Sequence, residues 1–449
     1  MVLAAAALIL FLILAGPALW NGYPLLQYDT GGYLARWHEG YLVPSRSTVY
    51  GVFLHLGENS DFWINVALQS AAATYVLLLT QRLLGIHSVP LRLASGLAVC
   101  LTSALPWLAS QLLTDIFVGL AVLSVFLLAV RHHHLTWPER LTLSAITMFA
   151  AASHSATFGL LVGLCVSGWL VRPLIRPHLS ASGLAAASMA ALAGAALLLA
   201  TNFALSGKLA WTPGGYGILF GRLLENGTVK PYLDKTCPRT AYALCPYRAT
   251  LPDTADDFLW GHSVFDKLGR FAGLGDEMRA IVLDAAAKDP LKQATEALRA
   301  SARQLTLVAT GEGMHNRLWH TYGTIERFVP AQVKPMRSAR QQQGGLHLET
   351  VNALHVPVAY LSMAGILAMI AGAFWKRRVD TTTLLAGTAA LALLGNAVLC
   401  GALSGPHPRY GARLVWLSTF VLAIALAQWL VRRWSQSDPD FTAVAPETP

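Results

Sequence analysis

The sequence predicts an all-α, polytopic membrane protein with about ten transmembrane segments. Of its 449 residues, 54% are hydrophobic and only 13% are charged, and the mean hydropathy is +0.48. A soluble domain carries roughly a quarter charged residues. The net charge of +9 comes mostly from lysines and arginines that flank apolar segments. It therefore indicates membrane topology and contact with lipid headgroups, and we expect no nucleic-acid partner.

Apolar runs of about 20 residues, the length that crosses a bilayer, predict the spans. They lie near residues 2–20, 62–81, 91–109, 111–130, 182–203, 354–374, 382–403 and 412–431. The stretch 141–171 is too long for one upright helix, and Ser153-His154-Ser155 interrupts it. We expect a hairpin of two short helices, 141–152 and 156–171. Residues 2–20 lack a basic region before them, which favours a retained helix over a cleaved signal peptide.

Basic residues orient these segments, because cytoplasmic loops carry an excess of lysine and arginine. With the N-terminus inside and ten crossings, the inner short segments hold eleven such residues and the outer short loops hold four. The inner ones are Arg82, Arg92, Arg131, Arg140, Arg172, Arg176, Lys376, Arg377, Arg378, Arg432 and Arg433, and the outer ones are Arg36, Arg46, Arg409 and Arg413. We therefore expect a multi-pass protein of the bacterial inner membrane with both chain ends in the cytoplasm.

Four regions follow from this topology. Residues 1–203 form an N-terminal transmembrane region with a first outer loop at 21–60, and 353–433 form a C-terminal one. Residues 204–352 form a large, mainly helical periplasmic loop domain, in which a helix over 216–225 is expected to lie on the membrane surface. The polar tail 434–449 is expected to be disordered and cytoplasmic.

The cysteines divide by location. Cys237 and Cys245 lie in the large outer loop, where an oxidising space lets a disulfide persist, so we expect them to pair. Cys100, Cys165 and Cys400 lie in apolar segments and are expected to be inert.

The stretch Asn21–Gly51, just outside the first span, holds the first candidate site residues. Asp29 is accompanied by the cations Arg36 and Arg46 and the rings of Tyr33 and Tyr50. A carboxylate, cations and aromatic rings at a lipid–water boundary suit an anionic, partly apolar substrate. Asp29 is a candidate general base, and the alternative is a turn residue, since Asp-Thr-Gly-Gly has ordinary turn chemistry.

Other unusual residues collect on the same outer face: Asp115, His154, His407, Arg409 and Tyr410. Asp115 is a second candidate catalytic carboxylate, or else an acid that interacts favourably with a helix dipole. His154 is a substrate ligand or a turn cap. Arg409 is a phosphate ligand, with its planar fork, or a headgroup anchor.

The three consecutive histidines His132, His133 and His134 look like a metal-binding cluster. They fall on the inner side beside Arg131 and have no acidic partner motif. We therefore interpret them as a solvated interface and predict no metal site.

The pattern resembles the GT-C superfamily of integral-membrane glycosyltransferases, which includes lipid A aminoarabinose transferases and protein O-mannosyltransferases. The similarity rests on Tyr28-Asp29-Thr30 with Tyr33, on the stretch from Arg46 to Gly51 before the second span, on Asp115, and on His407-Pro408-Arg409-Tyr410. It covers roughly residues 1–203 and 354–431. Here Thr30 stands where the family often has a second acid, and the loop 204–352 matches no periplasmic domain of the family.

The resemblance implies an enzyme that moves a sugar from a polyprenyl-phosphate donor to a hydroxyl acceptor in a lipid, a glycan or a protein of the cell envelope. The arginines would hold the lipid phosphate, Asp29 would take the acceptor proton, and Asp115 would assist. Cofactor need stays open, because some members use a divalent metal. The expected partners are the lipid-linked donor and membrane lipids. A transporter or flippase, and a polymerase or ligase of lipid-linked glycans, remain alternatives.

Overall fold

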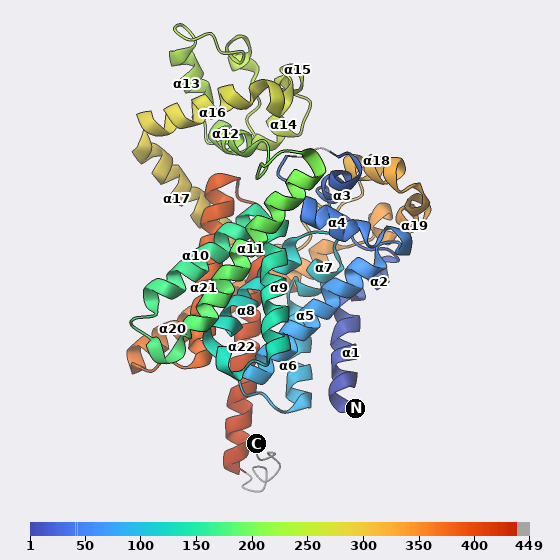
Figure 1. Cartoon of the computed structure of the whole chain (residues 1–449), viewed down its shortest axis with the longest axis vertical. Helices are drawn as coiled ribbons and strands as arrows, with labels where there is room; N and C mark the ends of the chain where they lie inside the picture. Colours follow the sequence, from blue (N-terminus) through green and yellow to red (C-terminus); the bar gives the residue numbers. More distant parts are fainter. Residues whose placement is uncertain (41, 43, 438–449) are drawn as a thin grey trace.

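The computed structural model describes residues 1–40, 42 and 44–437. Over this range the protein is all-helical and contains no β-strand, and one isolated bridge pairs Leu25 with Gln111. The start of the first helix and the last turns of the final helix lie at the same end of the helical bundle (Figure 1).

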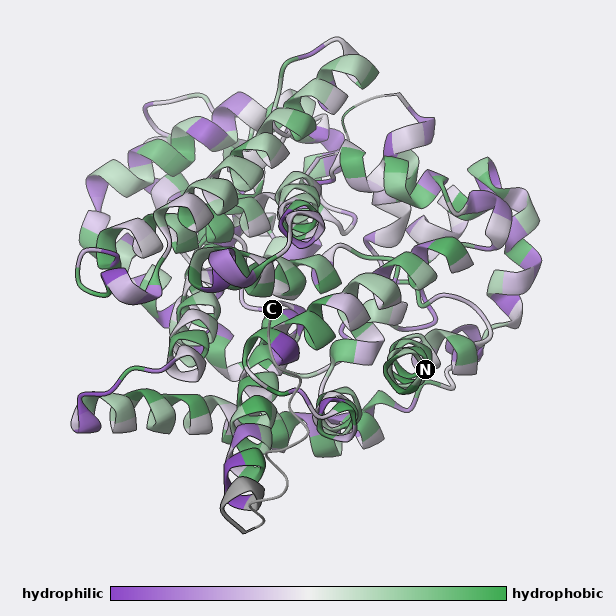
Figure 2. Ribbon diagram, turned by 60° about the horizontal axis from the view of Figure 1, so that its bottom comes forward, coloured by the Kyte–Doolittle hydropathy of each residue, from purple (hydrophilic) through white to green (hydrophobic). Residues whose placement is uncertain are grey.

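Six helices of the described chain are long and apolar enough to cross a membrane, which supports a multi-pass membrane protein. They are α5 (Trp63–Leu83), α8 (Asp115–Arg131), α11 (Ala181–Ser206), α20 (Leu348–Lys376), α21 (Thr381–Asn396) and α22 (Pro408–Ser437). A 3-10 turn continues α8 to His134, and a π-helical segment continues α21 to Ala402. Hydrophobic residues run along the bundle helices, whereas hydrophilic residues concentrate at loops and helix ends (Figure 2).

The other expected spans form shorter or interrupted helices. The run 2–20 divides into α1 (Val2–Leu14) and α2 (Gly16–Asn21), and 91–109 divides into α6 (Val89–Thr102) and α7 (Leu105–Ser110). In both cases a proline stands at the start of the second helix. The count of about ten is therefore not confirmed.

The predicted break at His154 is confirmed. It separates α9 (Trp137–Ser153) from α10 (Ser155–Val171), and His154 itself adopts an extended backbone. Each helix has 17 residues, fewer than the roughly 20 that an upright span needs.

The central helix of the bundle is α8. Every residue from Asp115 to Ala129 is buried, as expected for a helix that is apolar on all sides. It approaches α22 closely, since a Cβ added to Gly119 would lie 2.5 Å from the Trp416 ring. This contact brings the N-terminal ends of α8 and α22 together.

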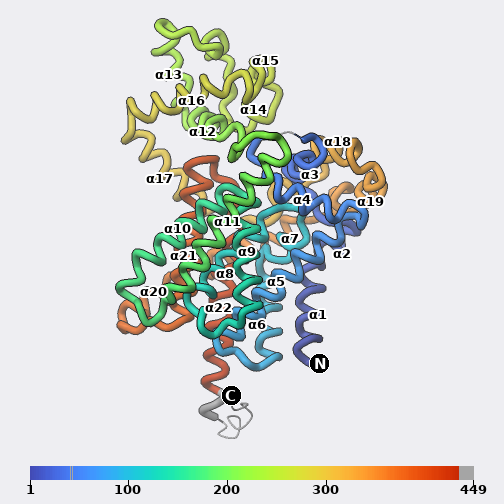
Figure 3. The backbone as a smooth tube through the Cα atoms, in the orientation of Figure 1, coloured from blue at the N-terminus to red at the C-terminus, as the bar shows by residue number. Residues whose placement is uncertain are grey.

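The long loop 204–352 folds as two parts. The first is a separate lobe of α12 (Gly215–Glu225), α13 (Val229–Thr236), α14 (Ala255–Leu259), α15 (Val264–Lys267) and α16 (Arg270–Lys288), and α17 (Pro290–Thr306) returns to the bundle (Figure 3). The lobe has its own apolar core. A disulfide joins Cys237 and Cys245 within it.

The helix α12 forms where the sequence predicts it, but it does not present its apolar face to a membrane. Phe220, Leu223 and Leu224 on that face are buried in the core of the lobe, where α14 and α16 cover them. The expected membrane-surface role is therefore wrong for this face.

The second part, residues 307–347, belongs to the main bundle. Its helices α18 (Trp319–Phe328) and α19 (Val333–Ser338) contribute to the same core as the membrane helices. α18 packs against α3 (Thr30–His38), which lies beside α4 (Thr48–His55) in the first outer loop. The first loop, which contains α3 and α4, and residues 307–347 thus support each other.

The tail was expected to be disordered from residue 434. Residues 434–437 continue α22 as helix, and 438–449 lie outside the described residues.

Candidate functional site

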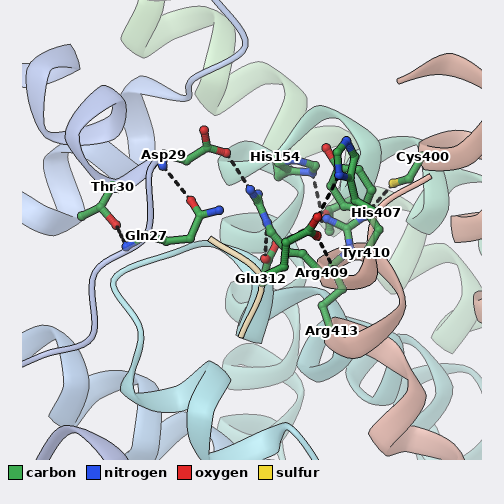
Figure 4. Close-up of polar contacts among 12 residues, drawn as sticks. Gln27, Asp29, Thr30, His154, Glu312, Cys400, His407, Arg409, Tyr410 and Arg413 are labelled. Atoms are coloured by element: carbon green, nitrogen blue, oxygen red, sulfur yellow. Dashed lines mark hydrogen bonds and ion pairs between the residues drawn. The ribbon is translucent and has the colours of Figure 1, made fainter. Parts of the chain in front are cut away.

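Five charged side chains form a continuous chain in which cations and anions alternate: Arg46, Asp29, Arg409, Asp115 and Arg413. Arg46 Nη2 donates to Asp29 Oδ1, and Arg409 Nη1 donates to Asp29 Oδ2 at 2.7 Å. Arg409 Nε donates to Asp115 Oδ2 at 2.7 Å, and Arg413 Nη1 donates to Asp115 Oδ1 at 3.4 Å. We call this set the ion chain; Figure 4 shows Asp29, Arg409 and Arg413 in it.

The side chains of the ion chain become more buried from Arg46 towards Arg413. The side chain of Arg46 is 16% exposed and that of Asp29 11%, whereas those of Asp115 and Arg413 are each 1% exposed. With three arginines and two carboxylates, it carries one excess positive charge. Charges of one sign that are held away from water attract a counter-ion strongly, so the open end at Arg46 and Asp29 favours an anionic ligand.

The pKa of Asp29 reflects this environment. Burial alone would raise the pKa of this carboxyl, but the charges of Arg46 and Arg409 outweigh burial and bring it below the ordinary value. Asp29 is therefore ionised at neutral pH. Both its oxygens accept hydrogen bonds from arginines, so it can take a proton readily only if those arginines are drawn away.

Helix geometry places the two inner arginines. Arg409 and Arg413 are four residues apart on α22 and hence on one face, and Asp115 is the first residue of α8 opposite them. Arg413 is also fixed by Asn396, whose Oδ1 accepts from its Nη2 at 2.6 Å, and by the Cys400 sulfur at 3.1 Å. The π-helical segment after Asn396 thus anchors the buried end of the ion chain.

A tight turn brings a further acid to the start of α22. Glu312 Oε2 accepts from the backbone N–H of Arg409 at 2.8 Å, and Glu312 Oε1 lies 3.0 Å from His407 Nδ1. The flanking Gly311 and Gly313 have φ of 92° and 76°, a conformation that other residues rarely adopt. A Cβ on Gly313 would also lie 2.4 Å from the ring of Tyr28.

The hydrogen bond from Glu312 raises the pKa of the His407 imidazole, although burial opposes the shift. The carboxylate therefore favours the protonated form of His407. The protonated His407 and the Glu312 carboxylate then form a pH-dependent ion pair beside the ion chain.

Thr321, on α18, holds the backbone around Asp29. Thr321 Oγ1 lies 3.1 Å from the Gln27 carbonyl oxygen and accepts from the Gly31 N–H at 3.1 Å. Gln27 Oε1 accepts from the Asp29 N–H at 2.6 Å. The other end of that amide, Gln27 Nε2, is buried and has no hydrogen-bond partner among the described residues. It is a spare donor beside Asp29.

Two predicted ligands, Arg36 and Tyr50, do not belong to the ion chain and make structural contacts. Arg36 is fully buried; its Nε donates to the Arg46 carbonyl oxygen at 2.8 Å and its Nη2 to Asn202 Oδ1 at 3.1 Å. Tyr50 is fully buried, with its hydroxyl 3.0 Å from Gln69 Oε1. The contact of Arg36 braces the backbone that carries Arg46, and the Tyr50 hydroxyl joins α4 to α5. Both side chains are buried and do not face an open site.

The remaining predicted ligands surround the ion chain. The ring of Tyr33 lies 5.7 Å from the Arg46 guanidinium carbon, and the ring of Tyr410 lies 5.5 Å and 5.2 Å from those of Arg409 and Arg413. Such cation–π contacts stabilise the arginines. Burial and the charge of Arg413 lower the pKa of His154 to about 3, so this imidazole is neutral at pH 7.

The lobe also reaches the accessible end. The ring of Trp260, directly after α14, lies 5.9 Å from the Arg46 guanidinium carbon and is 46% exposed. Nothing in the sequence around Trp260 distinguishes it from the other tryptophans, so this contact was not predicted.

The larger of two cavities lies away from the ion chain. A cavity of about 500 Å³ lies at the opposite end of the bundle, between α1 and α5, with Arg82, Arg92 and Glu139 at its wall. The cavity that touches Arg409 and Glu312 has only about 10 Å³, roughly the room for one water molecule. We favour the ion chain as the functional site, because it brings five charged side chains together, whereas most residues that line the large cavity are apolar. A ligand larger than water at this cavity would require neighbouring segments such as the 310–314 turn to move.

Sequence reasoning missed Glu312, Gln27 and Asn396. Glu312 lies between two glycines, Gly311 and Gly313, and this Gly-Glu-Gly pattern in an otherwise helical loop was the available signal. Gln27 and Asn396 had none, because buried amides matter only through the partners that the fold gives them.

A separate group of metal-ligand side chains lies in the first outer loop. His38, His55 and Glu58 offer ligand atoms that all lie within 4.8 Å of one another, and among the described residues no other such group occurs. No metal site was predicted from the sequence, and these three residues were not among the candidates.

The chain was compared with family models, with curated proteins and with solved structures, and none of them matches. The resemblance drawn from the motifs therefore stays a prediction. The geometry and charge of the ion chain are the observations that bear on function.

Proposed function

We propose that the protein is a membrane glycosyltransferase that moves a sugar from a polyprenyl-phosphate donor to a hydroxyl acceptor at the periplasmic face of a bacterial inner membrane. One observation carries the proposal: Arg46 and Arg409 clamp both oxygens of Asp29 in an ion chain with excess positive charge. That arrangement offers cations for a phosphate and a carboxylate for a proton at one place. Its position, at the ends of apolar helices, suits a ligand with a lipid tail.

The donor phosphate and Asp29 would compete for the same arginines. Guanidinium groups bind phosphate oxygens as well as carboxylate oxygens, often through two parallel hydrogen bonds. When Arg46 and Arg409 turn to the phosphate, Asp29 loses the cations that lower its pKa. The donor itself therefore converts a weak base into a stronger one.

The transfer forms one covalent bond and breaks another. The acceptor oxygen forms a bond to the anomeric carbon of the sugar, and the bond from that carbon to the phosphate oxygen breaks. The electron pair leaves with the polyprenyl phosphate, whose growing negative charge Arg46 and Arg409 stabilise. The acceptor proton passes to Asp29. Attack opposite to the leaving phosphate inverts the anomeric centre.

The second carboxylate acts differently. Asp115 is buried and both its oxygens face arginines, so it has no free face for an acceptor. Its role in the proposal is to position Arg409. Gln27 Nε2, the donor without a partner, is available for a phosphate oxygen or a sugar hydroxyl beside Asp29.

The test compares envelope glycolipids and glycans by mass spectrometry in cells that carry the wild type, no protein, Asp29→Asn or Arg409→Gln at matched membrane levels. We expect a product heavier by one sugar residue with the wild type and its loss in the other three. Arg299→Gln, an exposed arginine on α17, is the matched control and should keep the product.

Two outcomes would refute the proposal. One is an unchanged set of glycolipids and glycans with and without the protein. The other is a lipid-linked sugar that changes its side of the membrane while no sugar is transferred, which would indicate a flippase.

A further inference from the structure

His38, His55 and Glu58 form a compact group away from the ion chain. His38 Nε2 lies 2.7 Å from Glu58 Oε1, and His55 Nδ1 lies 2.8 Å from Glu58 Oε2. The side chains are 19%, 42% and 10% exposed. The group is thus preformed and still open to solvent on the His55 side.

Two imidazoles and one carboxylate are the ligand types that zinc and related divalent transition metals prefer. Zinc with ligand bonds of about 2.0–2.2 Å places neighbouring tetrahedral ligand atoms about 3.4 Å apart. The three ligand atoms here lie within 4.8 Å of one another. Small side-chain rotations therefore suffice to surround an ion, and a water molecule can take the fourth position.

Neighbouring side chains fix the orientation of the rings. His38 stacks on Phe328 of α18 with ring centroids 4.9 Å apart, and His55 stacks on Trp37 at 4.6 Å. Gln332 Nε2 donates to the Glu58 carbonyl oxygen at 2.6 Å. The stacking restrains the two rings and the hydrogen bond restrains the backbone of Glu58, so less conformational freedom is lost when an ion binds.

The group lies where it can link the C-terminal ends of two helices. His38 is the last residue of α3 and His55 the last of α4, while Asp29 and Arg46 lie just before the first residues of the same helices. The two helices therefore run side by side, joined by the ion chain at one end and by this group at the other. They touch in between, since a Cβ on Gly51 would lie 2.8 Å from the Tyr33 carbonyl oxygen.

We propose that His38, His55 and Glu58 bind one zinc-class divalent ion that clips α3 to α4. α3 has nine residues, so at a rise of about 1.5 Å per residue the ion lies about 14 Å from Asp29 along the helix. The ion touches no part of the ion chain. It stiffens the helix pair and thereby holds Arg46 against Asp29. This inference does not depend on the proposed glycosyl transfer.

The test uses the full chain purified in detergent without a polyhistidine tag, stripped with EDTA and incubated with excess ZnCl₂ or CoCl₂. We expect about one equivalent of zinc by mass spectrometry of the metal. We also expect visible absorption bands of tetrahedral or five-coordinate cobalt. His38→Gln, His55→Gln and Glu58→Gln should each weaken zinc binding at least 100-fold, because losing an outer-sphere partner alone costs about 10–100-fold. Glutamine keeps hydrogen bonding, so each variant should fold.

The control is the combined variant His133→Gln and His134→Gln, which removes the other histidine-rich segment and should keep the ion. EDTA should lower the thermal midpoint of the wild type and the control, but not that of Glu58→Gln. No bound zinc, or zinc lost only in the His133/His134 variant, would overturn the proposal. An equal drop in thermal midpoint on adding EDTA to the wild type and to Glu58→Gln would show that no ion bound by Glu58 links α3 to α4.

Discussion

The buried contact between Asp115 and Arg409 makes a strong prediction about stability. Asp115→Asn keeps the size of the side chain but leaves Arg409 and Arg413 facing a neutral amide. Arg409→Gln leaves the Asp115 carboxylate with Arg413 alone, at 3.4 Å. The side chains of Asp115 and Arg409 are 1% and 7% exposed, so water cannot replace the lost partner.

The size of the effect follows from the burial. Removing one partner of a buried ion pair costs about 3–5 kcal/mol, because the remaining charge stays uncompensated. The double variant removes both charges but also takes one partner from Arg413 and one from Asp29, so it should cost more than either single variant and less than their sum. We therefore expect a coupling energy of about 2–3 kcal/mol, near the upper end for contacting residues.

The assay is unfolding in mixed micelles with rising SDS fraction, followed by tryptophan fluorescence, for the wild type, both single variants and the double variant. The matched control cycle uses Arg299→Gln and Glu296→Gln, an ion pair in which Arg299 is 72% exposed. Exposed pairs contribute only about 0–1 kcal/mol. Additive effects at Asp115 and Arg409, or a coupling no larger than the control's, would refute the reasoning about the ion chain.

Three further predictions follow from the site and the topology. Asp29→Asn should lower sugar transfer about 10²–10⁴-fold at an unchanged level of folded protein; transfer at the wild-type rate would remove Asp29 as the base. Glu312 raises the pKa of His407 above its ordinary value of 6.5, so this pair should stabilise the fold fully below pH 6.5 and lose that contribution as the pH rises through the folded pKa. His407→Gln should abolish that decline in a pH series of thermal midpoints, and an unchanged decline would contradict the assignment. Leu209→Cys should react with an impermeant maleimide from outside and Arg377→Cys only from inside, with the native free cysteines buried; the reverse pattern would invert the expected topology.

Much of the architecture could be predicted from the sequence, because it depends on local composition and periodicity. Apolar length identified the six helices that could cross a membrane, and Ser153-His154-Ser155 marked the break between α9 and α10. The predicted count of about ten spans is not confirmed, since length in an apolar run does not show where a helix ends. Pro17 and Pro106 begin new helices inside two of the expected spans.

The candidate site was predictable as a list of residue types and only in part as an arrangement. Asp29, Arg46, Asp115 and Arg409 were singled out because charges beside apolar segments are costly and so stand out in a sequence. Their pairing was not predicted: which carboxylate meets which arginine depends on how α8 and α22 pack. The packing of the first loop against α11 assigned Arg36 to the support of the backbone.

What the sequence by itself determined is therefore the helical membrane class and the residue types of the candidate site, because hydrophobic length and charge are properties of short segments. Only the tertiary structure decided the order of the ion chain, the approach of Glu312 to His407 and the grouping of His38, His55 and Glu58. These contacts join residues up to 380 positions apart, as between Asp29 and Arg409. Contacts at such separations leave no local pattern, and packing of whole helices sets their geometry.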